Sequence, residues 1–110
     1  MKNMPLSARL NKRIEILQNV NANDLDESWA SSLMLFADVR ELLPNNVSFF
    51  EGVDFGNLIN QVYMLFTVRF NKNISKDQRI RFRQQSFLIK KIINVAQKDR
   101  IMEIIAMQVV

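Results

Sequence analysis

The chain has 110 residues, of which 48% are hydrophobic, and this predicts a single domain over residues 1–110 with enough apolar side chains for a core. Cysteine and histidine are both absent, so disulfides, thiolate or imidazole metal ligands and every nucleophile–histidine pair are excluded. The net charge of +4 is uneven, because residues 1–44 carry −1, residues 45–61 carry −2 and residues 62–110 carry +7. A basic half indicates either a solvated surface or an anionic neighbour, such as nucleic acid or an acidic protein face.

Apolar and polar residues alternate with a period of two over most of the chain, which predicts strands. In the first strand Ile14 and Ile16 share one face, while Arg13 and Glu15 share the other. Short links between the strands, including a hairpin at Lys98-Asp99, indicate antiparallel pairing. The fold class expected is therefore mainly all-β, a small antiparallel barrel of about six strands. The predicted strands lie near 13–16 and at 35–40, 62–70, 79–83, 87–95 and 100–109.

Residues 45–61 contain both glycines and are too long for an ordinary link, which predicts an arm. Residues 46–52 are expected to be extended. Asp54 is placed to cap a short helical turn, in which Phe55 begins the spacing of an amphipathic helix. The Phe49-Phe50 pair is expected either to close one end of the barrel or to contact another subunit.

The last predicted strand is apolar on both faces, although a small barrel buries only one face of a strand. Its outer face is expected to be covered either by residues 25–33, which contain Trp29, or by another subunit. Together with the arm, this strand supplies the predicted interface residues, which are Asn46, Phe49, Phe50, Glu51, Phe55, Ile101, Ile105 and Met107.

Few residues offer chemistry. Asp24, Asp26 and Glu27 form an acidic cluster without the spacing or central glycine of a calcium loop, which is typical of a solvated connection. The two glycines, four residues apart, fit no phosphate-binding motif. The sequence therefore predicts a protein that is not an enzyme and has no catalytic residue, metal or cofactor.

Basic residues are the remaining candidates for binding. Arg79, Arg81 and Arg83 are expected on the outer face of one strand, where with Lys72 and Lys76 they could contact phosphates or an acidic partner. The interleaved aromatic residues point to the opposite face, so they are expected in the core rather than stacked on bases.

The longest uninterrupted apolar runs, residues 33–37 and 62–66, have five residues each, against about 20 for a membrane-spanning helix. The N-terminus is polar and lacks the apolar segment of a signal peptide. The sequence therefore predicts a soluble intracellular protein with no membrane partner.

Over roughly residues 8–107 the chain carries, in this order, Leu10 before Arg13-Ile14, Trp29 before Phe36-Ala37-Asp38-Val39, Phe49-Phe50-Glu51, Phe66-Thr67-Val68-Arg69-Phe70, Asn73-Ile74, Arg79-Ile80-Arg81-Phe82, Phe87 with Ile89 and Ile92, and Met102-Glu103-Ile104. This order of motifs resembles the head closure proteins of long-tailed bacteriophages and prophages, also called head–tail joining or head–tail adaptor proteins. Two positions depart from that pattern. Ser7-Ala8 replaces an opening glycine, and Gln84-Gln85-Ser86 replaces a glycine turn, so that turn is expected to be longer or differently shaped.

The resemblance implies a structural connector in the neck of the virion, assembled in the cytoplasm of the bacterial host. It implies a twelve-fold ring of this chain under the portal or adaptor ring protein. This ring would close the exit channel for packaged double-stranded DNA and receive the tail through a tail terminator or tail-tube protein. Two alternatives stay open: a related tail-completion protein, and a small basic barrel that binds nucleic acid through Arg79, Arg81, Arg83 and Lys90.

Overall fold

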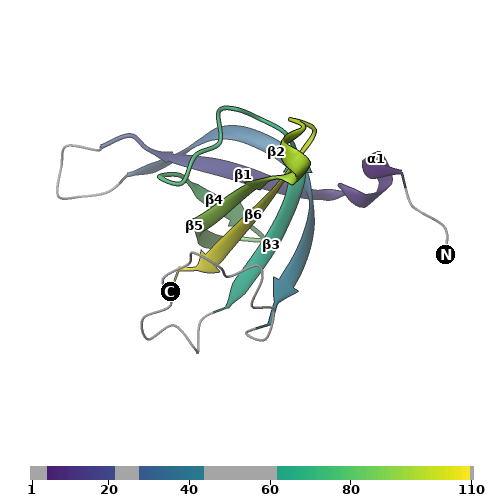
Figure 1. Ribbon diagram of the computed structural model, residues 1–110. Coiled ribbons are helices and arrows are strands. Elements are labelled where there is room, and N and C mark those ends of the chain that lie inside the picture. The colour runs from purple at the N-terminus through teal and green to yellow at the C-terminus, as the bar shows by residue number, and fades with distance from the viewer. Residues whose placement is uncertain (1–4, 22–27, 44–61, 110) are drawn as a thin grey trace.

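The computed structural model describes residues 5–21, 28–43 and 62–109. Its six strands form a closed antiparallel barrel in the order β1-β2-β3-β6-β5-β4 (Figure 1). The predicted all-β barrel is therefore confirmed, whereas the predicted arm and its helical turn lie outside the described residues. The elements are α1 (Leu6–Arg9), β1 (Lys12–Asn19), β2 (Trp29–Leu42), β3 (Tyr63–Arg69), β4 (Arg79–Phe82), β5 (Gln85–Asn94), the 3₁₀ turn η2 (Val95–Gln97) and β6 (Ile101–Gln108).

The barrel interior is filled by the apolar residues of the alternating pattern. Phe66 of β3 is fully buried, and its ring meets those of Phe82 and Phe87 edge-on, with centroids 6.1 and 5.4 Å away. Such aromatic pairs contribute about 0.5–1.5 kcal/mol beyond the burial of their area. The rest of the buried core consists of Ile14, Ile16, Ala37, Val68, Ile74, Ile80, Ile89, Met102, Ile104 and Ala106.

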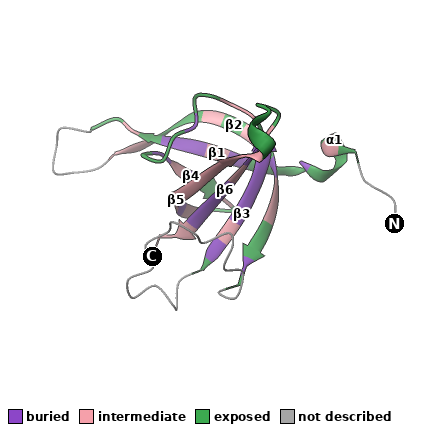
Figure 2. Cartoon of the chain, viewed as in Figure 1, coloured by how far each residue is buried: buried purple, intermediate pink, exposed green. Residues whose placement is uncertain are grey.

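The strands differ in how deeply they are buried. β3 and β6 are mostly buried, whereas β2 is exposed or half-buried along most of its length (Figure 2).

β2 is much longer than the predicted strand at residues 35–40, because it pairs with β1 over residues 29–37 and then with β3 over residues 38–42. β1 pairs with β4 over only three residues, so the far parts of β1 and β2 project from the barrel as a two-stranded hairpin (Figure 1).

A β-bulge interrupts β2. The partners of Ile16 and Leu17 on β2 are two residues apart, which leaves Ser32 between them without a cross-strand partner. The Ser32 hydroxyl donates a hydrogen bond of 3.2 Å to the carbonyl of Ile16. Because the bulge inserts one residue, it reverses the alternation before it and turns Trp29 to the outer face.

A second apolar cluster lies on the outer face of the barrel. Leu42, Tyr63, Leu65 and Ile105 are each at most 6% exposed, and Met107 packs against them half-buried. These residues occupy facing positions on β2, β3 and β6, so the cluster forms where the outward residues of three neighbouring strands are all apolar. The two-sided apolar pattern of β6 therefore serves two cores of the same chain.

The β4–β5 turn has two residues, Arg83 and Gln84, because Phe82 pairs directly with Gln85. Both turn residues have positive φ values, of 52° and 65°. This is the geometry of a type I′ hairpin, which glycine and asparagine normally occupy. The turn is thus shorter than the sequence predicts, and it lies one residue earlier.

The predicted hairpin between the last two strands is confirmed, with residues 95–100 as its connection. Asn94 and Asp99 bridge the base of this connection. The Asn94 side-chain amide donates to a carboxylate oxygen of Asp99 at 2.6 Å, and the Asp99 backbone N–H donates to the Asn94 side-chain oxygen at 3.1 Å. These two hydrogen bonds hold together the ends of a link that contains three residues with positive φ.

The single turn α1 follows Pro5 and has no counterpart in the predicted elements. Its first hydrogen bond runs from the N–H of Ala8 to the carbonyl of Pro5 at 3.0 Å. Leu10, directly after the turn, is buried, and Arg9 lies 3.6 Å from the carboxylate of Asp38 on β2. These contacts fix α1 beside β2.

Candidate interaction surfaces

Arg79 belongs to an aromatic stack on the outside of the barrel. Its guanidinium carbon lies 4.3 Å from the centre of the Trp29 ring, which the bulge at Ser32 has turned outward. Leu17 is the cross-strand partner of Arg79 and is buried on the same face. A cation–aromatic contact of this kind contributes about 0.5–2 kcal/mol, so one role of Arg79 is to anchor the projecting hairpin.

Arg81 forms a two-point ion pair with Glu15, its cross-strand partner on β1. Its Nη2 lies 2.9 Å from Oε2 of Glu15, and its Nε donates to Oε1 at 3.3 Å. This hydrogen bonding with Arg81 lowers the pKa of Glu15 from its usual value, with a smaller contribution from Ser31. The charge of Arg81 is therefore largely compensated within the chain.

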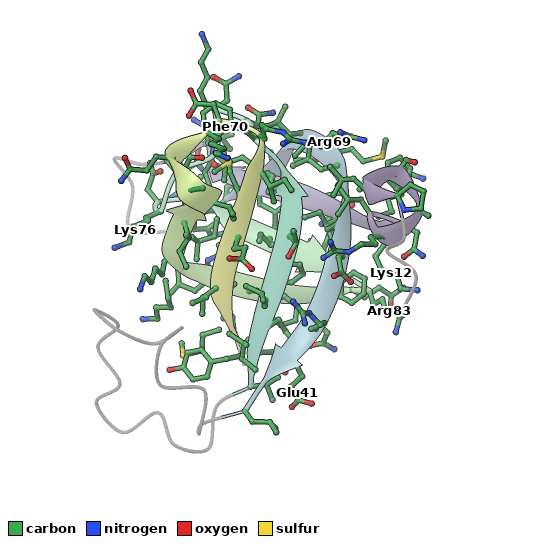
Figure 3. The ribbon with its side chains drawn as sticks, turned by 45° about the vertical axis from the view of Figure 1, so that its right-hand side comes forward. Lys12, Glu41, Arg69, Phe70, Lys76 and Arg83 are labelled. Atoms are coloured by element: carbon green, nitrogen blue, oxygen red, sulfur yellow. The ribbon has the colours of Figure 1, made fainter. Side chains whose placement is uncertain are left out.

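The other predicted basic residues do not continue this row. Arg83 lies in the β4–β5 turn rather than on the strand, with its guanidinium 4.9 Å from the Phe82 ring centre. Lys72 and Lys76 are exposed in the link between β3 and β4. Lys76 and Arg83 lie on opposite sides of the view in Figure 3. The five candidates are thus spread over several surfaces, and their contact with DNA or an acidic partner stays a prediction.

The predicted interface residues of β6 are only partly accessible. Ile105 is 0% exposed in the second cluster, while Ile101 and Met107 are half-buried. Trp29 does not supply the cover, since it lies near β1 and β4, across the barrel from β6. The single chain thus buries Ile105 without a second subunit. Asn46, Phe49, Phe50, Glu51 and Phe55 lie outside the described residues, and the interface role of all eight residues stays a prediction.

An exposed apolar surface on β2 has no counterpart in the predicted interface. Met34 and Phe36 are 47% and 55% exposed on its outer face. They line a surface pocket of about 340 Å³ with Ser7, Leu10, Leu35 and Arg69. The sequence contains a signal for this surface: Met34 and Phe36 share their face of the strand with Asp38 and Arg40, so two apolar side chains stand on a face that is otherwise polar.

Two kinds of site are not found in the described parts of the chain. Residues 5–21, 28–43 and 62–109 bring together no group of three or more metal-ligating side chains. Within the same residues, none of the helices has the length and apolarity that crossing a membrane would require.

Comparison with known proteins places this barrel in a family. Residues 6–109 match the family described as phage head completion protein. The solution structure of protein SF1141 from Shigella flexneri 2a is similar, with a TM-score of 0.65, 20% identity and 96% of each chain covered. A chain in the virion of a native gene transfer agent particle is similar with a TM-score of 0.64 and 18% identity, over 93% of this chain and 97% of that one. No curated protein matches the sequence.

Proposed function

Because the chain belongs to the phage head completion protein family, which gives it a structural role in the head–tail region of a phage particle, we propose that it is a connector in the virion neck. It assembles as a ring, with twelve-fold symmetry by family resemblance, under the portal or adaptor ring. There it closes the DNA exit channel and presents the surface that the tail terminator or tail-tube protein joins. Assembly takes place in the cytoplasm of the bacterial host.

The observation that carries the proposal is the extent of the family match. It runs from α1 to the residue after β6, so it includes the whole barrel rather than one motif. Support for a virion role comes from the similar fold in the gene transfer agent virion. A closed ring of identical subunits needs two different surfaces on each subunit that fit one another. The exposed apolar surface of β2 is suited to be one of them.

A ring through which DNA passes must contact the DNA backbone without recognising its base sequence. Lys72 and Lys76 are exposed in a link, where they can meet phosphates without reaching into a groove. A dedicated nucleic-acid module would need free arginines on β4, yet Arg81 is paired with Glu15 and Arg79 stacks on Trp29. These contacts favour the connector over the nucleic-acid-binding alternative.

The proposal is tested by adding the purified full-length protein to the portal–adaptor complex of the same phage or prophage. Sedimentation and electron microscopy are expected to find a ring of this chain on that complex, and the ring is expected to recruit the tail protein. The free protein serves as the control, because rings of this kind can require a template. A protein that stays monomeric in the presence of the portal–adaptor complex would overturn the proposal.

Tight binding of the free protein to oligonucleotides would instead support the nucleic-acid-binding module. The connector predicts weak binding without sequence preference, which weakens further as salt rises. Fluorescence anisotropy with a labelled duplex at two salt concentrations separates these outcomes.

A further inference from the structure

β2 has an open edge where it parts from β3. Its pairing with β3 begins at Asp38, although β2 itself begins at Trp29. Among the residues that the structure describes, those at 30–36 other than the bulged Ser32 pair with β1 alone, so one side of this stretch of backbone has no partner strand. An unpaired strand edge is a template for adding another strand.

The side chains along this edge favour such an addition. Met34 and Phe36 are about half exposed on its outer face, where apolar side chains gain from being covered. The pocket that they line also includes Arg69, the last residue of β3, and Leu10 after α1. The pocket therefore lies beside the open edge, where β2 and β3 separate. An added strand could form backbone hydrogen bonds with the edge and place an apolar side chain in the pocket. Sheets bind extended peptides by this combination of contacts.

The surroundings of the edge carry more arginines than acids, and Glu15, opposite Met34 on β1, is already paired with Arg81. Arg69 lines the pocket, and Arg13 contacts the sulfur of Met34. Arg9 and Arg40 both approach the carboxylate of Asp38, at 3.6 and 3.9 Å, so two cations share one acid. An occupant that combines acidic with apolar side chains would therefore complement both the arginines and the exposed apolar side chains of this surface.

This chain contains a segment of that composition. Residues 45–61 carry Glu51 and Asp54 and no basic residue, together with Phe49, Phe50 and Phe55. The two strands that flank this segment meet at its ends, because Leu42 of β2 pairs with Tyr63 of β3. A loop anchored in this way reaches outward by about half its residues, or about 30 Å when extended. That reach matches the shorter dimensions of the molecule, 30 and 27 Å, so the segment can reach a neighbouring copy.

The same reach limits how much of the edge this segment could cover in its own chain. Ala30 is twelve residues from Leu42 along β2, which places it about 40 Å away in an extended strand. A segment anchored beside Leu42 with a reach of at most about 30 Å could meet the part of the edge near Phe36, about 20 Å away, but could not cover the edge as far as Ala30. The corresponding segment of a second copy is anchored to another barrel, so the distance from Leu42 does not limit how far along the edge it can bind.

We propose that the open edge of β2, at residues 30–36, binds residues 45–61 of a second copy of this chain as an added strand, with Phe36 and Met34 covered and the acidic residues facing the surrounding arginines. The inference rests on the proposed function, in which copies of this chain are neighbours in a ring. It identifies one of the two surfaces that such a ring needs.

The test is photo-crosslinking from the edge in full-length protein. Phe36→p-benzoylphenylalanine is made in both ¹⁵N-labelled and unlabelled chains, which are mixed and irradiated at high concentration and on the portal–adaptor complex. The expected products join position 36 to residues 45–61, with labelled and unlabelled chains combined in about half of them. Products confined to chains of one label would place the segment on its own barrel and overturn the proposal. Products with portal or tail proteins, or none with residues 45–61, would also overturn it.

A pair of charge variants tests the same surface by association. Phe36→Glu places an acid where the acidic segment would bind, whereas Val20→Glu changes a residue of similar exposure, 60%, outside the pocket. Sedimentation is expected to give at least a tenfold weaker self-association for Phe36→Glu and no change for Val20→Glu. Thermal unfolding checks that both variants fold. Equal association of the two variants would overturn the proposal.

Electron microscopy of the crosslinked samples separates this inference from the proposed function. Rings that form on the portal–adaptor complex without crosslinks to residues 45–61 would refute the edge and leave the connector standing. If the wild-type protein forms no rings there either, the connector is refuted, and the crosslinks in the labelled mixture of free protein alone test the edge.

Discussion

Glu15 is held in its ionised form mainly by one close partner, Arg81. Its carboxylate meets the guanidinium of Arg81 at two points on the outer face of the β1–β4 pair. Because the arginine favours the ionised carboxylate, the pKa of Glu15 is lower in the folded chain than its usual value of 4.5. The pair thus contributes stability only while Glu15 is ionised.

This gives a prediction for the pH dependence of folding. A depressed pKa in the folded state means that the contribution of Glu15 is present above pH 4.5 and is lost as the pH falls through the folded value. Glu15→Gln is expected to be less stable than the wild type at pH 7, and this difference should shrink below pH 4. Urea unfolding at both pH values measures it. A difference that stays constant across this range would show that the ion pair does not stabilise the fold.

The β4–β5 turn places two non-glycine residues, Arg83 and Gln84, in the left-handed region of backbone conformation, which costs about 1–2 kcal/mol per residue. Gln84→Gly is therefore expected to raise the free energy of unfolding by about 0.5–1 kcal/mol, after the extra entropy of glycine in the unfolded chain is subtracted. Gln85→Gly is the control, because Gln85 begins β5 and is not among the residues with positive φ. That neighbouring change should lower stability. Chemical denaturation of both variants checks the prediction, and a destabilised Gln84→Gly would contradict it.

At the scale of elements, the bulge in β2 decides what the projecting hairpin rests on. By inserting Ser32, it turns Trp29 outward onto Arg79 of β4. β1 and β4 pair over only three residues, so this stack adds a contact where the ladder is short. The hairpin and β4 are thus joined by side chains as well as by backbone.

A double-mutant cycle measures that contact. Trp29→Ala and Arg79→Ala are each expected to destabilise the protein, and their coupling should be about 0.5–1 kcal/mol. Circular dichroism follows unfolding in all four proteins, because Trp29→Ala removes the chain's one tryptophan. In Arg79→Ala, the fluorescence of Trp29 reports the local change as a shift of emission to longer wavelength. Additive effects of the two variants would mean that the stack contributes nothing.

At the scale of the whole molecule, the closed barrel places Phe66 and Phe36 in opposite environments. Phe66 is 0% exposed among the rings of the core, whereas Phe36 is 55% exposed on β2. Phe66→Ala is therefore expected to cost about 3–5 kcal/mol, through lost burial and the cavity that remains. Phe36→Ala should change stability by less than about 0.5 kcal/mol. Urea unfolding of the two variants compares them directly, and equal losses would mean that Phe36 stabilises the monomer rather than an interface.

The local pattern in the sequence determines the strands, their number and most of their faces. Alternation places Ile14 and Ile16 inside and Glu15 outside, and it does so for Phe66 and Ile104 as well, because a strand turns successive side chains to opposite sides. The same pattern marks the connection around Lys98-Asp99. The family resemblance rests on this order of motifs, and the family match over residues 6–109 agrees with it.

Only the tertiary structure decides which strands meet and where the pairing stops. The bulge at Ser32, the burial of Ile105 against β2 and β3, and the open edge before Asp38 each depend on the register between strands far apart in the sequence. Register follows from the packing of all six strands into one closed barrel, and no local pattern contains that information. For this reason the sequence predicts the core, while the exposed surface at Met34 and Phe36 emerges from the assembled fold.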